Sequence, residues 1–267
     1  MPLFSLVALA LIQGITEFLP VSSSAHLELF HRWAGQTPDD LSLDIAVHVG
    51  TLLAVMLYFR AEVGRAIKGT FLLLTGKTER PEARLALCLI VATIPVVVAG
   101  AILKVTGLVE AMRSLAVIGW AMILFGLLLW WMDRRGGRGR TAADWTLRDA
   151  WIMGLWQALA LIPGTSRSGA AITGALAQGY ERGEGARLAM LMSIPTIAGS
   201  GALLGADLAI SGNMSLGADV IVAVVLAFAA GLGALALMMR LLRSVSFTPY
   251  VIYRVLLGLV LLALAYS

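Results

Sequence analysis

The sequence predicts an all-α polytopic membrane protein, built as an inverted repeat with six full spans and two broken re-entrant helical hairpins. Charged residues make up 13% of the 267 residues and hydrophobic residues 59%, whereas soluble domains carry about 25% charged residues. Six apolar runs approach the roughly 20 residues that cross a bilayer as a helix. Two further segments, 3–33 and 151–180, are helical in composition but too polar and too interrupted by proline to span.

Three predicted spans follow each polar segment. They cover residues 43–59, 85–103, 115–132, 186–206, 220–239 and 250–266. The first 19 residues lack the basic start and the small-residue cleavage site of a signal peptide, so we interpret them as retained. The single cysteine, Cys88, lies in an apolar run, which excludes an internal disulfide and a cysteine metal site.

The two polar segments also resemble each other. Leu-Pro-Val-Ser-Ser-Ser at 19–24 aligns with Ile-Pro-Gly-Thr-Ser-Arg at 162–167, an offset of 143 that matches an apolar residue, a proline and hydroxyl residues. A basic linker separates the halves. We therefore divide the chain into a first repeat at 1–133, a linker at 134–148 and a second repeat at 149–267.

Loop charges predict how each segment sits. Loops 60–84, 133–148, 180–187 and 240–246 are rich in Arg and Lys and are predicted to be cytoplasmic, whereas 207–219 has no basic residue and is predicted to be external. These loops account for the net charge of +4 better than nucleic-acid binding does. Segment 151–180 then enters and leaves from the cytoplasm and segment 3–33 from outside, so their tips could meet near the midplane, where such repeats place polar sites.

The first break carries a candidate catalytic set. Glu17 lies in an apolar stretch, where an ionisable group costs about 3 kcal/mol to insert and is functional by default; an interfacial position is the alternative. Gln13 lies one helical turn earlier on the same face. His26, three residues after Ser23, is predicted to reach a serine hydroxyl as acid or base. His31 and His48 are left out of this set.

Serines follow the first break directly. The hydroxyls of Ser22, Ser23 and Ser24, together with the free N–H groups of the next helix start, indicate an anion site. A plain helix cap formed by the serines is an equal alternative.

The second break places one arginine among hydroxyls and glycines at a helix start. Arg167 has no acid within four residues, and a guanidinium beside several donors matches a phosphate in charge and geometry. Snorkelling of the arginine to the membrane surface is the alternative. The predicted substrate contacts around it are Gly164, Thr165, Ser166, Ser168 and Gly169.

The stretches QGITEFLPVSSSAH at 13–26 and PGTSRSG at 163–169 resemble the two signature motifs of the bacterial undecaprenyl-diphosphate phosphatases, also called bacitracin-resistance proteins. The resemblance extends over essentially the whole chain. It implies hydrolysis of undecaprenyl diphosphate to undecaprenyl phosphate and inorganic phosphate, which recycles the carrier lipid for cell-wall synthesis and confers bacitracin resistance. It also implies a bacterial inner-membrane protein whose site opens to the periplasm.

Carried over by position, the resemblance implies a role for each central residue. Ser23 would be the nucleophile, His26 its acid or base partner, and Arg167 the diphosphate clamp. Glu17 would hold a divalent cation, Mg²⁺ or Ca²⁺, or transfer a proton. Many members have a second glutamate where this chain has Gln13, which leaves one carboxylate for the cation here. Gln13, Ser22 and Ser24 are counted with the substrate contacts.

Two other functions are compatible with the same architecture. A lipid-phosphate flippase or transporter would use the same inverted-repeat site. The other alternative is a lipid-binding scaffold without catalytic activity. The sequence leaves open whether a serine or a water attacks, which metal and lipid length are used, and whether the chain forms a homodimer.

Overall fold

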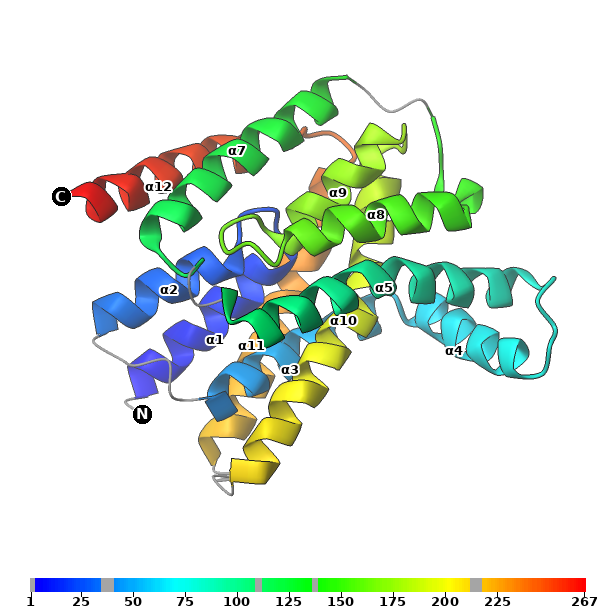
Figure 1. Ribbon diagram of the computed structural model, residues 1–267, viewed down its shortest axis with the longest axis horizontal. Coiled ribbons are helices and arrows are strands. Elements are labelled where there is room, and N and C mark those ends of the chain that lie inside the picture. The colour runs from blue at the N-terminus through cyan, green and yellow to red at the C-terminus, as the bar shows by residue number, and fades with distance from the viewer. Residues whose placement is uncertain (1–2, 35–40, 109–111, 136–138, 212–217) are drawn as a thin grey trace.

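The computed structural model describes residues 3–34, 41–108, 112–135, 139–211 and 218–267. Within these ranges the chain folds into helices joined by short turns (Figure 1). The elements in order are α1 (Leu3–Phe18), α2 (Ser23–Ala34), α3 (Leu41–Tyr58), α4 (Arg60–Leu74), α5 (Pro81–Thr106), α7 (Leu115–Arg134), the 3₁₀ turn η1 (Ala142–Asp144), α8 (Leu147–Leu159), α9 (Arg167–Ala177), α10 (Arg182–Ser211), α11 (Ala218–Leu241) and α12 (Thr248–Tyr266).

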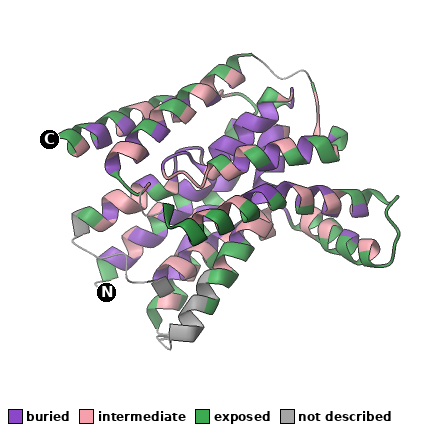
Figure 2. Ribbon diagram, viewed as in Figure 1, coloured by how far each residue is buried: buried purple, intermediate pink, exposed green. Residues whose placement is uncertain are grey.

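The helices confirm a multi-pass membrane protein. Five of them, α5, α7, α10, α11 and α12, are long and apolar enough to cross a bilayer, and α3 with α4 makes a sixth span if that bent pair is counted as one. Figure 2 shows exposed residues on the outer faces of these helices, and many of them are Leu, Ile and Val. Such a surface faces lipid in a membrane protein.

The predicted loop at 60–84 is wrong over its first part. Residues Arg60–Leu74 form α4, which meets α3 at an angle of 93°. The stretch turns because α4 packs along α5, where Gly69 lies against the carbonyl of Glu82. Its basic residues indicated a loop, but they lie at intervals along one helix. Residues 136–138 of the predicted linker and 212–217 of the predicted external loop lie outside the described residues.

Both polar segments form broken hairpins, as predicted. The first consists of α1 and α2, with 16 and 12 residues, and the second of α8 and α9, with 13 and 11 residues. At about 1.5 Å per residue none of these helices spans a bilayer core of about 30 Å. The first pair breaks where Pro20 cannot continue α1, and the second where Ala160 to Ser166 form a turn before α9.

The helices of the two halves interleave, and the packing repeats. Helix α1 packs on α11 as α8 packs on α5, α3 contacts α11 as α10 contacts α5, and α7 pairs with α12. Gly14 makes the first of these contacts close, because an added Cβ would lie 2.8 Å from the carbonyl of Ala227; at Gly154 it would lie 2.4 Å from that of Ala92. Small residues allow such backbone approaches in membranes. These pairings support an inverted repeat, whose boundaries stay a prediction.

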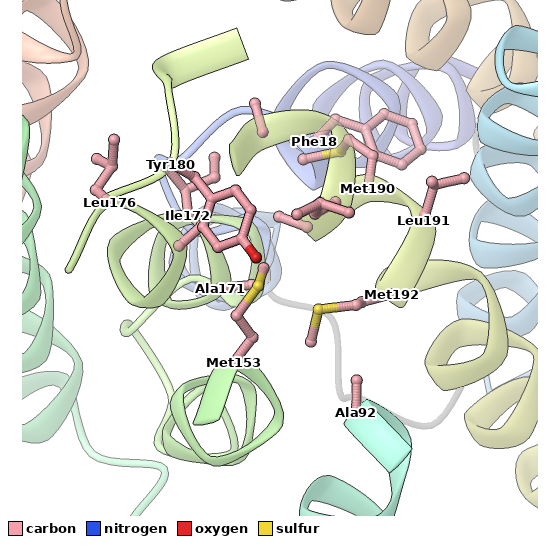
Figure 3. Packing of buried hydrophobic residues seen from close by; sticks show 14 of the residues in the cluster. Phe18, Ala92, Met153, Ala171, Ile172, Leu176, Tyr180, Met190, Leu191 and Met192 are labelled. Carbon is pink, nitrogen blue, oxygen red and sulfur yellow. The ribbon is translucent and has the colours of Figure 1, made fainter. Parts of the chain in front are cut away.

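The largest hydrophobic cluster surrounds α9. Every residue from Ser168 to Leu176 is buried, and Figure 2 shows buried residues gathered on this helix and on the faces turned towards it. Figure 3 shows Phe18 of α1, Met153 of α8 and Met190 of α10 among the side chains that pack there. The start of α9 is therefore held in the interior of the molecule.

Candidate active site

The two breaks use the same backbone device. Ser22 and Ser166 have φ values of 72° and 70°, the only positive values among the described non-glycine residues, and each directly precedes a helix start. Ser22 shares a hydrogen bond of 3.1 Å with Ser24, and Ser166 shares one of 3.1 Å with Ser168. Left-handed backbone at such residues costs about 1–3 kcal/mol and concentrates at functional sites.

The offset between the two breaks is one residue larger when their left-handed serines are aligned than when their prolines are aligned. The prolines of the two breaks are 143 residues apart, but the left-handed serines are 144 apart, because the second turn holds one more residue. This turn includes Gly164, whose φ is 90° and whose Cβ, if present, would lie 2.4 Å from the carbonyl of Ile118. Gly164 therefore permits the close packing of the turn on α7.

The tips of the two hairpins meet, as the topology predicts. The Nη2 of Arg167 lies 2.5 Å from Oε1 of Glu17. The hydroxyl of Ser168 donates to the carbonyl of Leu19 at 3.0 Å, and the backbone N–H of Gly164 donates to Ser24 Oγ at 3.4 Å. Side chains 150 residues apart thus share one polar site inside an apolar protein.

Glu17 is the centre of this site. Its Oε2 accepts hydrogen bonds of 2.8 Å from the amide of Gln13 and from the hydroxyl of Ser23, while Oε1 binds Arg167. Glu17 is 8% exposed, and Ser23 is partly exposed at the start of α2. A serine hydroxyl that donates to a carboxylate has a proton acceptor in place, which is the arrangement that activates a nucleophile.

We had expected His26 to reach a serine hydroxyl, and this prediction is wrong. Its Nδ1 lies 2.7 Å from the carbonyl oxygen of Ser22, and its Nε2 lies 2.6 Å from the hydroxyl of Tyr253 on α12. The two rings are stacked, with centroids 5.5 Å apart. The helical spacing from Ser23 was correct, but the imidazole turns towards the helix start and α12. Glu17 therefore occupies the position beside the Ser23 hydroxyl.

Arg167 is held by both halves of the chain. Besides Glu17 it binds the carbonyl of Ser193 on α10 at 3.1 Å, and its side chain is 16% exposed. It lies at the first position of α9, where unpaired backbone N–H groups and the helix dipole attract anions. Ser166 caps this helix by accepting a bond of 3.2 Å from the N–H of Gly169. The acid that neutralises Arg167 comes from the other hairpin.

A second buried arginine, Arg254 on α12, was missed in the sequence analysis. It is 0% exposed, and it donates hydrogen bonds of 2.8 to 3.5 Å to five backbone carbonyls. The acceptors are Pro20 of the first break, Gly164 and Thr165 of the second, and Ala121 and Met122 of α7. Gly169 leaves room for it, since an added Cβ would lie 2.8 Å from the Nη1 of Arg254.

Arg254 could have been found by the rule that singled out Glu17. It is an ionisable residue inside the apolar run 250–266, and such residues are functional by default in membranes. Tyr253, the partner of His26, carried no such signal in the sequence. Gly164 and Gly169, predicted as substrate contacts, have packing roles that the geometry explains directly.

Three buried polar atoms in and near the site have no hydrogen-bond partner in the part of the chain that the structure describes. They are Oε1 of Gln13, Oε1 of Gln157 and Oγ1 of Thr165. Buried polar groups normally have a partner, so such atoms indicate water, an ion or a ligand. The Nδ1 of His48 lies 2.7 Å from the carbonyl oxygen of Asp44, and the imidazole is near enough to Glu17 to interact electrostatically with that carboxylate.

The described residues contain no group of three or more His, Cys, Asp or Glu side chains that could hold a metal ion. The site nevertheless offers the Glu17 carboxylate beside the unpaired Gln13 amide oxygen. Mg²⁺ prefers oxygen ligands and is often bound by one or two carboxylates together with substrate phosphates and water. These residues therefore fit a cation that enters with a phosphate substrate better than one held by protein alone.

The fold and the site together define a class. A multi-pass membrane protein that brings together an arginine, two helix starts and a serine bonded to a buried carboxylate has the parts of a membrane-embedded phosphoryl-transfer enzyme. The family model of bacitracin resistance protein BacA matches residues 6–260. The chain belongs to this family.

Curated relatives cover the whole chain. It is 61% identical to the undecaprenyl-diphosphatase of Ruegeria pomeroyi and 60% identical to that of Roseobacter denitrificans, each over 267 residues and the full length of both proteins. The undecaprenyl-diphosphatase of Hahella chejuensis is 46% identical over 261 residues, which cover 98% of this chain and 97% of that protein.

Proposed function

We propose that this chain hydrolyses undecaprenyl diphosphate to undecaprenyl phosphate and inorganic phosphate. The observation that carries the proposal is the contact between the two breaks, where Arg167 and Ser23 both bind Glu17 at the starts of two helices. The full-length similarity to proteins named undecaprenyl-diphosphatase supports the substrate. Recycling of the carrier lipid for cell-wall synthesis, and bacitracin resistance, follow from this activity.

In the proposed reaction Ser23 attacks the terminal phosphorus. Its hydroxyl proton passes to Glu17, which accepts its hydrogen bond at 2.8 Å. The bond between that phosphorus and the bridging oxygen breaks, and undecaprenyl phosphate leaves. Water then hydrolyses the phosphoserine and restores the hydroxyl. If instead a water attacks directly, Glu17 would take the proton from that water, and Ser23 would orient it.

The second break holds the charge of the diphosphate. Arg167 and the backbone N–H groups at the starts of α2 and α9 supply donors for its oxygens. Because Arg167 is bound to Glu17 before substrate arrives, the diphosphate competes with this carboxylate for the guanidinium. That competition leaves Glu17 freer to take a proton. His26, bonded to Tyr253, is the proposed acid for the leaving oxygen.

A divalent cation, Mg²⁺ or Ca²⁺, belongs to the proposal. Glu17 and Gln13 would hold it, and when bound it would neutralise charge on the diphosphate oxygens. The second carboxylate that many family members carry is absent at Gln13, so we expect weaker cation binding here than in those members. Calorimetric titration of the Gln13→Glu variant with Mg²⁺ should show tighter binding than the parent; equal affinity would contradict the assignment.

Phosphate release by the purified protein in detergent tests the proposed function. With undecaprenyl or farnesyl diphosphate the parent should release phosphate, and Arg167→Ala and Glu17→Ala should each lose about 1,000-fold or more in turnover. Arg240→Ala, an exposed arginine at the end of α11, is the matched control and should retain activity. A transporter without hydrolytic activity would release no phosphate in any of these samples.

We also propose that the protein lies in the bacterial inner membrane with its site open to the periplasm. The charge distribution of the loops supports this orientation. In a Cys88→Ser background, Ala206→Cys should react with an impermeant maleimide in intact cells. Ala143→Cys should react only after permeabilisation. The opposite pattern would invert the topology.

A further inference from the structure

A polar cavity lies apart from the proposed active site, where α4, α5 and α10 begin. It has a volume of about 380 Å³. We call it the basic pocket, lined by Glu62, Arg65, Pro81, Arg84, Leu85, Cys88, Ala142, Ala143, Trp145, Arg187, Leu188 and Leu191. Six residues of α10, about 9 Å at 1.5 Å per residue, separate Arg187 from Ser193, which binds Arg167.

The lining of the basic pocket carries more positive than negative charge. Its one acid, Glu62, is bound by Arg187. Arg65 and Arg84 form no ion pair with any part of the chain that the structure describes. Glu82, on the same helix as Arg84, is bound by Lys68 at 2.8 Å. Arg65 is near enough to Glu82 to interact with its charge, but neither Arg65 nor Arg84 has a carboxylate of the described residues within ion-pair distance, so both guanidinium groups can bind an anion.

An unused hydrogen-bond donor lies in the same wall. Trp145 is 4% exposed, and its indole N–H is buried without an acceptor among the described residues. A buried donor left unpaired lowers stability, so it indicates an acceptor that the protein itself does not supply. The two arginines favour a negatively charged ligand rich in acceptor oxygens, and the unpaired N–H lies in a residue of the same lining, beneath its surface.

Phosphate is the anion that fits this set. Its oxygens accept several bonds at once, and guanidinium groups match its charge and geometry. The neighbouring surface of α4 exposes Ile67, Phe71 and Leu74, and a helix with exposed apolar and basic side chains lies at the boundary of lipid and water. We propose that the basic pocket binds a phosphate group at this boundary, either on the head of an anionic lipid or as the free ion.

Native mass spectrometry of the purified full-length protein tests this site. The probes are dioleoyl phosphatidylglycerol, dioleoyl phosphatidylcholine and inorganic phosphate. The parent should bind phosphatidylglycerol at least tenfold more tightly than phosphatidylcholine, and the double variant Arg65→Gln/Arg84→Gln should lose about tenfold of the former. Trp145→Phe, which removes the N–H donor together with part of the buried ring, should lose about threefold. Displacement of the lipid by phosphate would identify the free ion as a ligand, and its failure to displace would identify the lipid head.

The matched control is Arg240→Gln/Arg243→Gln, two exposed arginines that do not line the pocket. This control should bind phosphatidylglycerol as the parent does. Equal binding of the two lipids by the parent, unchanged binding in the pocket variants, or the same loss in the control would each overturn the proposal. The double variant should keep the elution volume and melting temperature of the parent, because Arg65 and Arg84 are exposed. If the double variant misfolds, the lipid binding of Trp145→Phe, compared at equal folded fraction, decides the test.

Discussion

The two breaks differ in chemistry although they share a backbone design. Each turns through a left-handed serine into a helix start, and each pairs that serine with the hydroxyl two residues later. The first break leaves Ser23 partly exposed and Ser24 exposed, whereas the hydroxyls of the second are buried. The same backbone turn therefore presents a reactive hydroxyl, that of Ser23, at the first break and a fixed positive charge, that of Arg167, at the second.

Neither break forms a complete active site without the other. Glu17 needs Arg167 from the other hairpin to compensate its buried charge. Arg254 binds carbonyls of both turns, so the relative position of the two breaks depends on a helix outside either hairpin. Substitutions of the reactive group should therefore cost more activity than substitutions of the residues that position it.

Removal of the Ser23 hydroxyl should have the largest effect. If Ser23 is the nucleophile of the first break, Ser23→Ala lowers kcat by about 1,000-fold or more. Ser24→Ala, on the next residue and exposed, should lose less than about tenfold. Steady-state phosphate release from farnesyl diphosphate measures both. A tenth or more of parent activity in Ser23→Ala would exclude covalent attack and favour a direct attack by water.

Arg167→Lys tests whether the second break needs a guanidinium or only a charge. A lysine cannot bind Ser193, Glu17 and a phosphate oxygen with the geometry of the arginine fork. We expect kcat/KM to fall by about 100-fold, with the same melting temperature. Activity within about threefold of the parent would mean that the second break contributes charge alone.

Arg254→Lys tests whether a residue outside both breaks positions them. Lysine keeps the charge but cannot reach five carbonyls on three segments, so the two tips should shift and kcat should fall by about tenfold. A role in stability alone would lower the melting temperature and leave kcat unchanged in the folded fraction. Arg254→Met should lose more than Arg254→Lys, because it leaves the buried carbonyls without a donor.

Gly164→Ala tests the extra residue that distinguishes the second turn from the first. The φ of 90° and the 2.4 Å approach to Ile118 leave no room for a methyl group. We expect a destabilisation of about 1–3 kcal/mol and a severalfold loss of activity, measured by thermal unfolding and phosphate release. Gly183→Ala is the control, since nothing lies within 4 Å of its added Cβ. Equal stability of both variants would show that the turn can rearrange.

The sequence predicted the architecture and most of the polar site. Apolar length and loop charge gave six spans and two opposed hairpins, because membrane insertion depends on those two properties. The meeting of Glu17 and Arg167 followed from that topology. The helix at 60–74 was missed because its regularly spaced basic residues have the composition of a loop.

Contacts between distant segments were less predictable. The direction of the His26 ring depends on Tyr253, which is 227 residues away, and no local spacing encodes that pair. Arg254 is different, because its charge inside an apolar run was visible in the sequence. The roles of Ser23, His26 and the other site residues stay predictions until they are measured.

Tyr253→Phe should have the smallest effect, and it tests how far the first break relies on α12. The substitution keeps the stacked ring at 5.5 Å but removes the hydroxyl that holds Nε2 of His26 at 2.6 Å. Loss of one such bond corresponds to about threefold to tenfold. If His26 donates a proton to the leaving oxygen, kcat should fall and its pH dependence should shift, with KM unchanged. Tyr250→Phe, one helical turn earlier on α12, should change neither. An unchanged pH profile in Tyr253→Phe would make His26 a structural cap of the Ser22 carbonyl, and the proton transfers would then rest on Glu17 alone.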